Sequence, residues 1–214
     1  MRPATIVAIK AVLLVLLLAP LGQLGFQVWQ SISGSGEGLG VNPIERLTHR
    51  TGELALYVLL LSLAVTPLRN LTGRAVLTRF RRLIGLCAFV YATLHLAVYV
   101  LDRSLGEDGF TLRDVAKDIA KRPYITIGTL AFGILLALAV TSTNGMIRRL
   151  GKSWQTLHRL VYGAALLGVI HFAWLVKASL VKPLILFGVL VSLMAARLPA
   201  WLKPSNSKAK RAAP

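Results

Sequence analysis

Residues 83–101 read LIGLCAFVYATLHLAVYVL, a run without Asp, Glu, Lys or Arg. As an α-helix rising about 1.5 Å per residue, this run covers nearly all of the roughly 30 Å of bilayer hydrocarbon. Only helices and closed barrels cross a membrane with every backbone group paired. Comparable apolar runs predict five further spans, at residues 6–29, 52–68, 124–143, 154–176 and 183–202. The sequence therefore predicts an all-α fold, a six-helix transmembrane bundle.

The composition agrees with this fold class. The chain has 214 residues, of which 55% are hydrophobic and 15% charged, and its mean hydropathy is +0.66. Soluble domains carry about 25% charged residues, so the composition strongly disfavours a soluble enzyme. Six spans of about 20 residues leave only short loops and tails, with no room for an appended catalytic domain. No internal repeat is evident, and any chemistry must occur among the helices or on a partner.

The charged residues are divided unequally between alternate loops. One set of loops, together with both termini, holds 16 basic residues and no acidic ones, whereas the other set holds nine basic residues and all eight acidic ones. The positive-inside rule therefore predicts that both termini are cytoplasmic. The orientation of the chain in the membrane and contact with anionic lipid then account for the net charge of +17, so no nucleic-acid partner is expected. In the longest external loop, residues 110–119 predict a short surface helix.

Three of the four histidines lie inside predicted spans, His95 in the third and His158 and His171 in the fifth. Ionisable side chains inside a membrane are costly and mark functional sites. A lone transmembrane histidine can also be a hydrogen-bonded packing residue. Because the spans contain no cluster of carboxylates that would form a proton relay, the histidines favour metal or heme ligation.

Depth in the membrane decides which histidines can share an iron. His95 lies six residues before Leu101, about 9 Å below the outer boundary, and His171 lies five before Val176, about 8 Å below it. The matched depths predict a six-coordinate heme b held by His95 and His171. His158 lies near the cytoplasmic face, about 20 Å from His171, and has no histidine partner there.

His158 has two possible roles. It is either an additional iron ligand or a residue at the membrane interface that forms a hydrogen bond with the backbone of a loop or with a lipid phosphate. On a straight helix the side chains of His158 and His171 would point about 140° apart. Both histidines could face one stack of cofactors only if the helix bends between them, and Gly163 and Gly168 would permit such a bend.

Basic residues gather at the predicted cytoplasmic ends of the spans. These arginines could bind a flavin phosphate or heme propionates through bidentate contacts, or simply lipid headgroups. On the external side, Arg50 and Arg103 could likewise meet propionates. The cytoplasmic cluster comprises Arg79, Arg81, Arg82, Arg148, Arg149 and Arg159.

Several stretches resemble the MsrQ family, the heme-binding membrane subunits of bacterial methionine sulfoxide reductase systems, which are themselves similar to the membrane domain of ferric reductases and NADPH oxidases. The stretches are THRTGE at 48–53, RRLIG at 81–85 with YATLH at 91–95, KRPYIT at 121–126, and WQTLHRLVY at 154–162 followed by His171. The resemblance extends over residues 44–174.

The resemblance implies a b-type heme carrier, with flavin mononucleotide (FMN) also associated with the family, in the bacterial cell inner membrane. It implies that electrons pass from a cytoplasmic flavin reductase or the quinone pool to a periplasmic molybdopterin subunit, MsrP, which reduces oxidised methionines. The chain would then be an electron-transfer subunit without a catalytic residue of its own.

The chain departs from the wider oxidase pattern, in which each of two ligand helices carries two histidines. Here the third span has only His95, and Arg81 and Arg82 stand where the inner partner would be. The number of hemes is therefore open, and the space near His158 becomes a candidate flavin site. We expect His95 and His171 to bind iron, with His158 as a further candidate, and Arg81, Arg82 and Arg159 to contact a cofactor.

These expectations divide the chain into four parts. Residues 1–43 form a first transmembrane helix and external loop, 44–176 a heme-binding four-helix core, 177–202 a sixth transmembrane helix, and 203–214 a disordered basic cytoplasmic tail.

Two other functions are compatible with a membrane-spanning helix bundle. One is a self-contained membrane quinone or metal reductase of the cytochrome b type, which the lack of a nucleotide-binding domain disfavours. The other is a heme-free transporter, and the lack of intramembrane acids disfavours a proton-coupled form of it.

Overall fold

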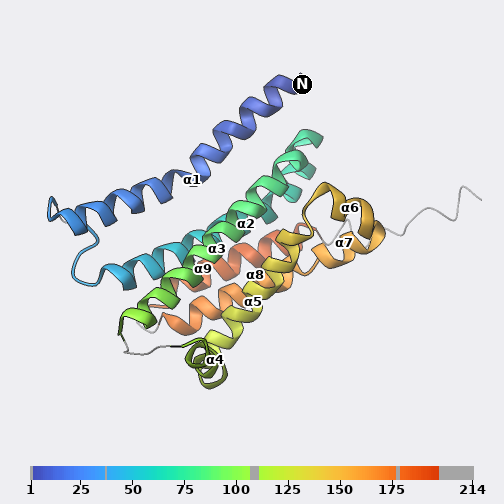
Figure 1. Cartoon of the computed structure of the whole chain (residues 1–214). Coiled ribbons are helices and arrows are strands. Elements are labelled where there is room, and N and C mark those ends of the chain that lie inside the picture. Colours follow the sequence, from blue (N-terminus) through green and yellow to red (C-terminus); the bar gives the residue numbers. More distant parts are fainter. Residues whose placement is uncertain (1, 37, 107–110, 177–178, 198–214) are drawn as a thin grey trace, which may run out of the picture.

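The computed structural model describes residues 2–36, 38–106, 111–176 and 179–197, which form helices and connections without a β-strand. The longer helices are α1 (Pro3–Ser33), α2 (Pro43–Thr72), α3 (Thr78–Gly106), α5 (Pro123–Val140), α8 (Val161–Leu175) and α9 (Val181–Ala195). The shorter ones are the 3-10 helix η1 (Ala75–Leu77), α4 (Leu112–Lys121), α6 (Asn144–Leu150) and α7 (Lys152–His158). Figure 1 shows the long helices gathered into a bundle with α1 along one side. The predicted tail at 203–214 lies outside the described residues.

Five segments are long and apolar enough to cross a membrane, which confirms an all-helical, multi-pass membrane protein. They are α1, α2, α3 with η1, α5, and α7 with α8, and they correspond to the first five predicted spans. The sixth predicted span falls on α9, an apolar helix of 15 residues. A helix of that length covers about 22 Å, less than the hydrocarbon thickness. The sixth span and the cytoplasmic position of both termini therefore stay predictions.

Two helix pairs form the core. α2 packs along α3 and α5 packs along α8, while α9 contacts both α8 and α2. α1 is attached at the edge: the buried Tyr91 hydroxyl of α3 donates a hydrogen bond to the carbonyl oxygen of Leu17 at 2.7 Å. Most other apolar side chains of α1 are exposed, as expected for a helix that faces lipid.

The predicted fifth span is not one straight helix. α7 ends at His158 and α8 begins at Val161, and the amides of Arg159 and Leu160 donate to carbonyls three residues earlier, at 3.2 and 3.0 Å. Such bonds tighten the chain into a 3-10 turn. The angle calculated between His158 and His171 for a continuous helix therefore does not apply, and the irregularity precedes both glycines of α8.

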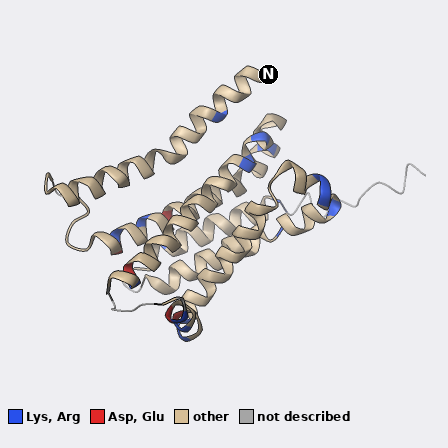
Figure 2. Cartoon of the chain, viewed as in Figure 1, with Lys and Arg blue, Asp and Glu red and all other residues tan. Residues whose placement is uncertain are grey.

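The charges separate along the bundle, as Figure 2 shows. Every described acidic residue lies toward the end that carries α4, the α4 end, whereas the end that carries α6 and α7, the α6/α7 end, is basic. Glu37, Glu107, Asp108 and Lys177, which also entered the charge count, lie outside the described residues.

The predicted surface helix is α4, which begins two residues later than expected; Phe110 lies outside the described residues. Its first turn is closed by a capping box, in which Thr111 and Asp114 exchange side-chain and backbone hydrogen bonds. The Lys117 ammonium and then the Thr111 hydroxyl lower the pKa of the Asp114 carboxyl to about 2. Asp114 therefore remains ionised, and able to cap the helix, throughout the physiological pH range.

Arg197 joins three elements at the α6/α7 end of the bundle. Pro67 lies inside α2 and has no N–H to donate to the carbonyl of Leu63, four residues earlier. Arg197, a residue only 3% exposed, donates from its guanidinium to that carbonyl and to the Tyr162 hydroxyl of α8. The arginine thus supplies the donor that the proline removed and anchors the chain after α9.

We expect Arg197→Met to destabilise the bundle, because it leaves the Leu63 carbonyl buried without this donor. An unsatisfied buried polar group costs about 1–3 kcal/mol, which lowers the melting temperature by roughly 5 °C. Thermal unfolding of the purified protein in detergent measures the change. Arg74→Met, at an exposed arginine, is the matched control, and equal melting temperatures for the two variants would contradict the anchoring role.

Candidate cofactor site

The structure brings His95 and His171 together near the α4 end of the bundle. His95 extends from α3 and His171 from α8, and their ring centroids lie 6.1 Å apart with an angle of 77° between the ring planes. The equal depths counted from the sequence thus correspond to side chains that face each other.

Each ring is held by a backbone carbonyl of a neighbouring helix. Nδ1 of His95 lies 2.8 Å from the Thr48 oxygen of α2, and Nδ1 of His171 lies 2.7 Å from the Tyr124 oxygen of α5. A carbonyl can only accept, so each Nδ1 carries the proton and donates it. Each Nε2 then keeps its lone pair, the form in which imidazole binds a metal.

The spacing of the two rings fits an iron between them. A metal–nitrogen bond of about 2.0 Å and a further ~1.1 Å from Nε2 to the ring centre would separate the two centroids by about 6 Å, close to the observed 6.1 Å. No group of three or more His, Cys, Asp or Glu residues that could hold a metal occurs among the described residues. Two protein ligands suit a porphyrin, which supplies four more nitrogens.

The histidines line a largely apolar pocket with an empty volume of about 1280 Å³, including its mouth. Its walls come from α2, α3, α5 and α8, and two residues of α4 complete the lining. An apolar pocket lined by two imidazole rings is suited to a flat, apolar cofactor. Representative lining residues are Leu56, Ala92, Phe132, Phe172, Val115 and Ile119.

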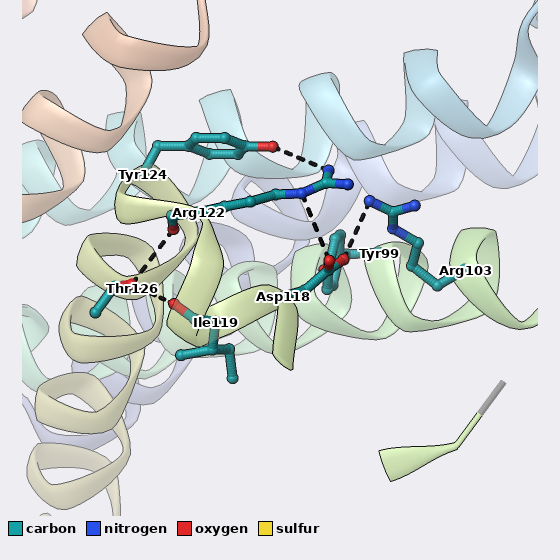
Figure 3. A network of polar contacts seen from close by, with 7 residues as sticks. All are labelled: Tyr99, Arg103, Asp118, Ile119, Arg122, Tyr124 and Thr126. Carbon is teal, nitrogen blue, oxygen red and sulfur yellow. Dashed lines mark hydrogen bonds and ion pairs between the residues drawn. The ribbon is translucent and has the colours of Figure 1, made fainter. Parts of the chain in front are cut away.

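A polar network, drawn in Figure 3, holds α4 in place beside this pocket. The Asp118 carboxylate accepts a hydrogen bond from the Tyr99 hydroxyl at 2.9 Å and pairs with Arg103 at 3.1 Å and Arg122 at 3.5 Å. Arg122 also donates to the Tyr124 hydroxyl at 3.3 Å. The network therefore connects α4 to α3 and to the start of α5, next to the carbonyl that holds His171.

The two external arginines expected at heme propionates have acidic neighbours here. Arg103 pairs with Asp118, and Arg50 lies 3.7 Å from Glu53, which also accepts a hydrogen bond from Lys182 at 2.9 Å. Their contact with propionates stays a prediction.

His158 lies away from the other two histidines, in a second pocket near the α6/α7 end. Its ring stacks on Trp154, with centroids 3.9 Å apart, and its Nε2 lies 3.2 Å from the Thr141 hydroxyl. The pocket has an empty volume of about 1430 Å³ with its mouth, and none of its described lining residues is acidic.

Four arginines line this second pocket. Three were expected from the sequence, Arg81, Arg82 and Arg159, and the fourth is Arg69. Arg82 also donates to the Asn144 side chain at 2.6 Å. The other members of the predicted cluster, Arg79, Arg148 and Arg149, are not among the residues that line it.

Comparison with known proteins agrees with this architecture. The family model described as "Ferric reductase like transmembrane component" matches residues 51–169, which include His95 and His158. The chain belongs to this family of transmembrane proteins.

Three similar proteins share one name. "Protein-methionine-sulfoxide reductase heme-binding subunit MsrQ" of Xanthomonas oryzae pv. oryzae is 48% identical over 92% of this chain and 88% of its own length. The proteins of the same name from Xanthomonas euvesicatoria pv. vesicatoria and Herminiimonas arsenicoxydans are 44% and 42% identical, over 98% and 97% of this chain and 94% and 92% of their own lengths.

Sequence reasoning missed the groups that hold the histidines in place. The acceptors are main-chain oxygens of Thr48 and Tyr124, and a backbone carbonyl leaves no trace in residue type. One signal was present: each histidine follows its carbonyl partner by 47 residues.

Proposed function

We propose that this protein carries heme b and passes electrons across the bacterial inner membrane to a periplasmic molybdopterin reductase, MsrP, that repairs oxidised methionines of periplasmic proteins. The observation that carries the proposal is the pair His95 and His171, which face each other at 6.1 Å with both Nδ1 atoms bonded to carbonyls. The names of the relatives, which are heme-binding subunits, support it.

Heme supplies a one-electron redox centre when bound. The chain contributes two neutral imidazoles, His95 and His171, which would both hold the heme iron and would suit it to electron transfer. The apolar walls exclude water, and the Nδ1 hydrogen bonds fix the orientation of the rings and raise their basicity. Such a site is suited to electron transfer, with the reduction of sulfoxide left to the partner.

An exit for electrons leads from His171 toward the α4 end, which is the predicted periplasmic face. The Tyr124 ring centroid lies 6.4 Å from that of His171, and the Tyr124 hydroxyl accepts from Arg122 at the pocket mouth. The sequence segment 102–122 contains five basic and five acidic residues, which would dock a soluble reductase by complementary charge.

The second pocket is the proposed site of FMN and the entry for electrons. Arg81, Arg82 and Arg159 would bind the phosphate, and the stacked Trp154 and His158 rings offer a planar surface for an isoalloxazine ring. A cytoplasmic flavin reductase or the quinone pool would supply the electrons.

We expect His95→Ala and His171→Ala each to abolish low-spin heme, because each removes one of two axial ligands. His158→Ala should keep one bis-histidine heme, since its ring lies in the other pocket. Reduced-minus-oxidised visible spectra of the purified variants measure the outcome. If His158→Ala alone removed all heme and His171→Ala did not, the pairing would be wrong; wild-type protein without any heme signal would contradict the whole proposal.

FMN binding tests the second pocket. We expect Arg81→Gln to weaken FMN binding about tenfold or more, because it removes a charge-assisted contact with the phosphate. Quenching of flavin fluorescence on titration measures the affinity. Arg148→Gln is the control, from the same predicted cluster but not lining the pocket. Equal affinities of the two variants would rule out this pocket, and heme reduction by quinol without FMN would favour the quinone-reductase alternative.

The direction of electron flow is testable in vesicles of known sidedness. With reduced flavin at the α6/α7 face, we expect heme to be reoxidised by the reductase added at the α4 face, and more slowly as salt rises. Heme absorbance follows the reaction. Reoxidation that is equally fast without the reductase, or that needs the reductase at the α6/α7 face, would reverse or remove the assignment.

A further inference from the structure

The two helix pairs of the core present their histidines by the same arrangement. In the pair α2 and α3, the Thr48 carbonyl accepts from His95; in the pair α5 and α8, the Tyr124 carbonyl accepts from His171. In each pair the first helix supplies the carbonyl and the second supplies the histidine. Tyr124 and His171 lie 76 positions after Thr48 and His95, respectively. The core is therefore a structural repeat, although none was evident in the sequence.

Each repeat also places a glycine against its histidine. A Cβ atom on Gly52 would lie 3.0 Å from Nδ1 and Cε1 of His95, and one on Gly128 would lie 2.8 Å from Nδ1 of His171. Real Cβ atoms essentially never approach a heavy atom closer than 3.0 Å. The two glycines are again 76 positions apart, as are further identical residues: Leu54 and Leu130, Ala55 and Ala131, Leu59 and Leu135, and Ala97 and Ala173.

The position of the glycines has a simple geometric reason. Gly52 follows Thr48 by four residues, and Gly128 follows Tyr124 by four. In an α-helix the residue at i+4 lies one turn above the carbonyl of residue i, on the same face. A Cβ atom there would meet the imidazole ring, so glycine leaves room for a ring that approaches this carbonyl from the neighbouring helix.

We propose that Gly52 and Gly128 are positioning residues that fix the planes of the two histidine rings. The hydrogen bond at Nδ1 holds one atom of each ring but allows the ring to tilt about that contact. The flat glycine backbone against the Nδ1 and Cε1 edge removes this freedom. The resulting 77° between the planes is then a property built into the two helix pairs.

This inference rests on the proposed heme ligation and predicts an electronic signature. In low-spin ferric heme the relative orientation of two axial imidazoles sets the splitting of the iron d orbitals. Nearly perpendicular planes leave two of these orbitals almost degenerate and give an electron paramagnetic resonance (EPR) signal with an unusually large highest g value. Parallel planes give a more rhombic signal with a smaller one. The orientation of the rings is therefore measurable without any assay of electron transfer.

The experiment compares EPR spectra of the purified, heme-loaded wild type with Gly52→Ala and Gly128→Ala. The wild type should show the signal of crossed planes. Each alanine variant should lower the highest g value, or lose low-spin heme while remaining folded, because the added methyl group displaces the ring. Gly133→Ala is the matched control, since it lies on α5 with nothing within 4 Å of its Cβ position, and it should leave the spectrum unchanged.

The outcomes separate this inference from the proposed function. A wild-type signal of parallel planes, or glycine variants with the same spectrum as Gly133→Ala, would overturn the positioning role while heme ligation stands. Wild-type protein without low-spin heme would refute the ligation itself. If neither glycine variant folded, the wild-type spectrum alone would decide between crossed and parallel planes.

Discussion

An imidazole inside an apolar helix bundle needs a hydrogen-bond acceptor for its N–H group, and in this protein both acceptors are carbonyls of neighbouring helices. In both cases the residue one turn after the acceptor is a glycine, Gly52 or Gly128, and the missing side chain leaves room for the imidazole ring against the helix. The two hydrogen bonds join α2 to α3 and α5 to α8, the closely packed pairs of the core. Because Nδ1 of each ring bonds the backbone, Nε2 is the ring nitrogen left for a metal.

Much of this arrangement could be predicted from the sequence. Residue counts from the ends of apolar runs placed His95 and His171 at one level, because helical rise is nearly constant. The 3-10 turn at Arg159 and Leu160 could not be predicted, since neither residue is a helix breaker and the tightening depends on tertiary packing. Arg197 is one of the 16 basic residues on the predicted cytoplasmic side, yet it lies buried against a carbonyl that Pro67 leaves without its helical donor.

The repeat also explains why the two ends of the core differ. At 76 positions apart, His95 corresponds to His171, but His158 corresponds to Arg82. One end therefore presents two neutral ligands in an apolar pocket, whereas the other presents a histidine among arginines. Among the described residues, that end contains no second pair of facing histidines. The arginines that line its pocket favour an anionic ligand.

The network around Asp118 has a consequence for how long a bound molecule remains in the apolar pocket. This carboxylate ties α4 to Arg103 of the first helix pair and to Arg122 at the start of the second. Val115 and Ile119 of α4 line the pocket, so a ligand that left on this side would have to displace a ten-residue surface helix held by both ion pairs. Its residence time would then depend on the strength of these pairs as well as on its contacts with the pocket walls.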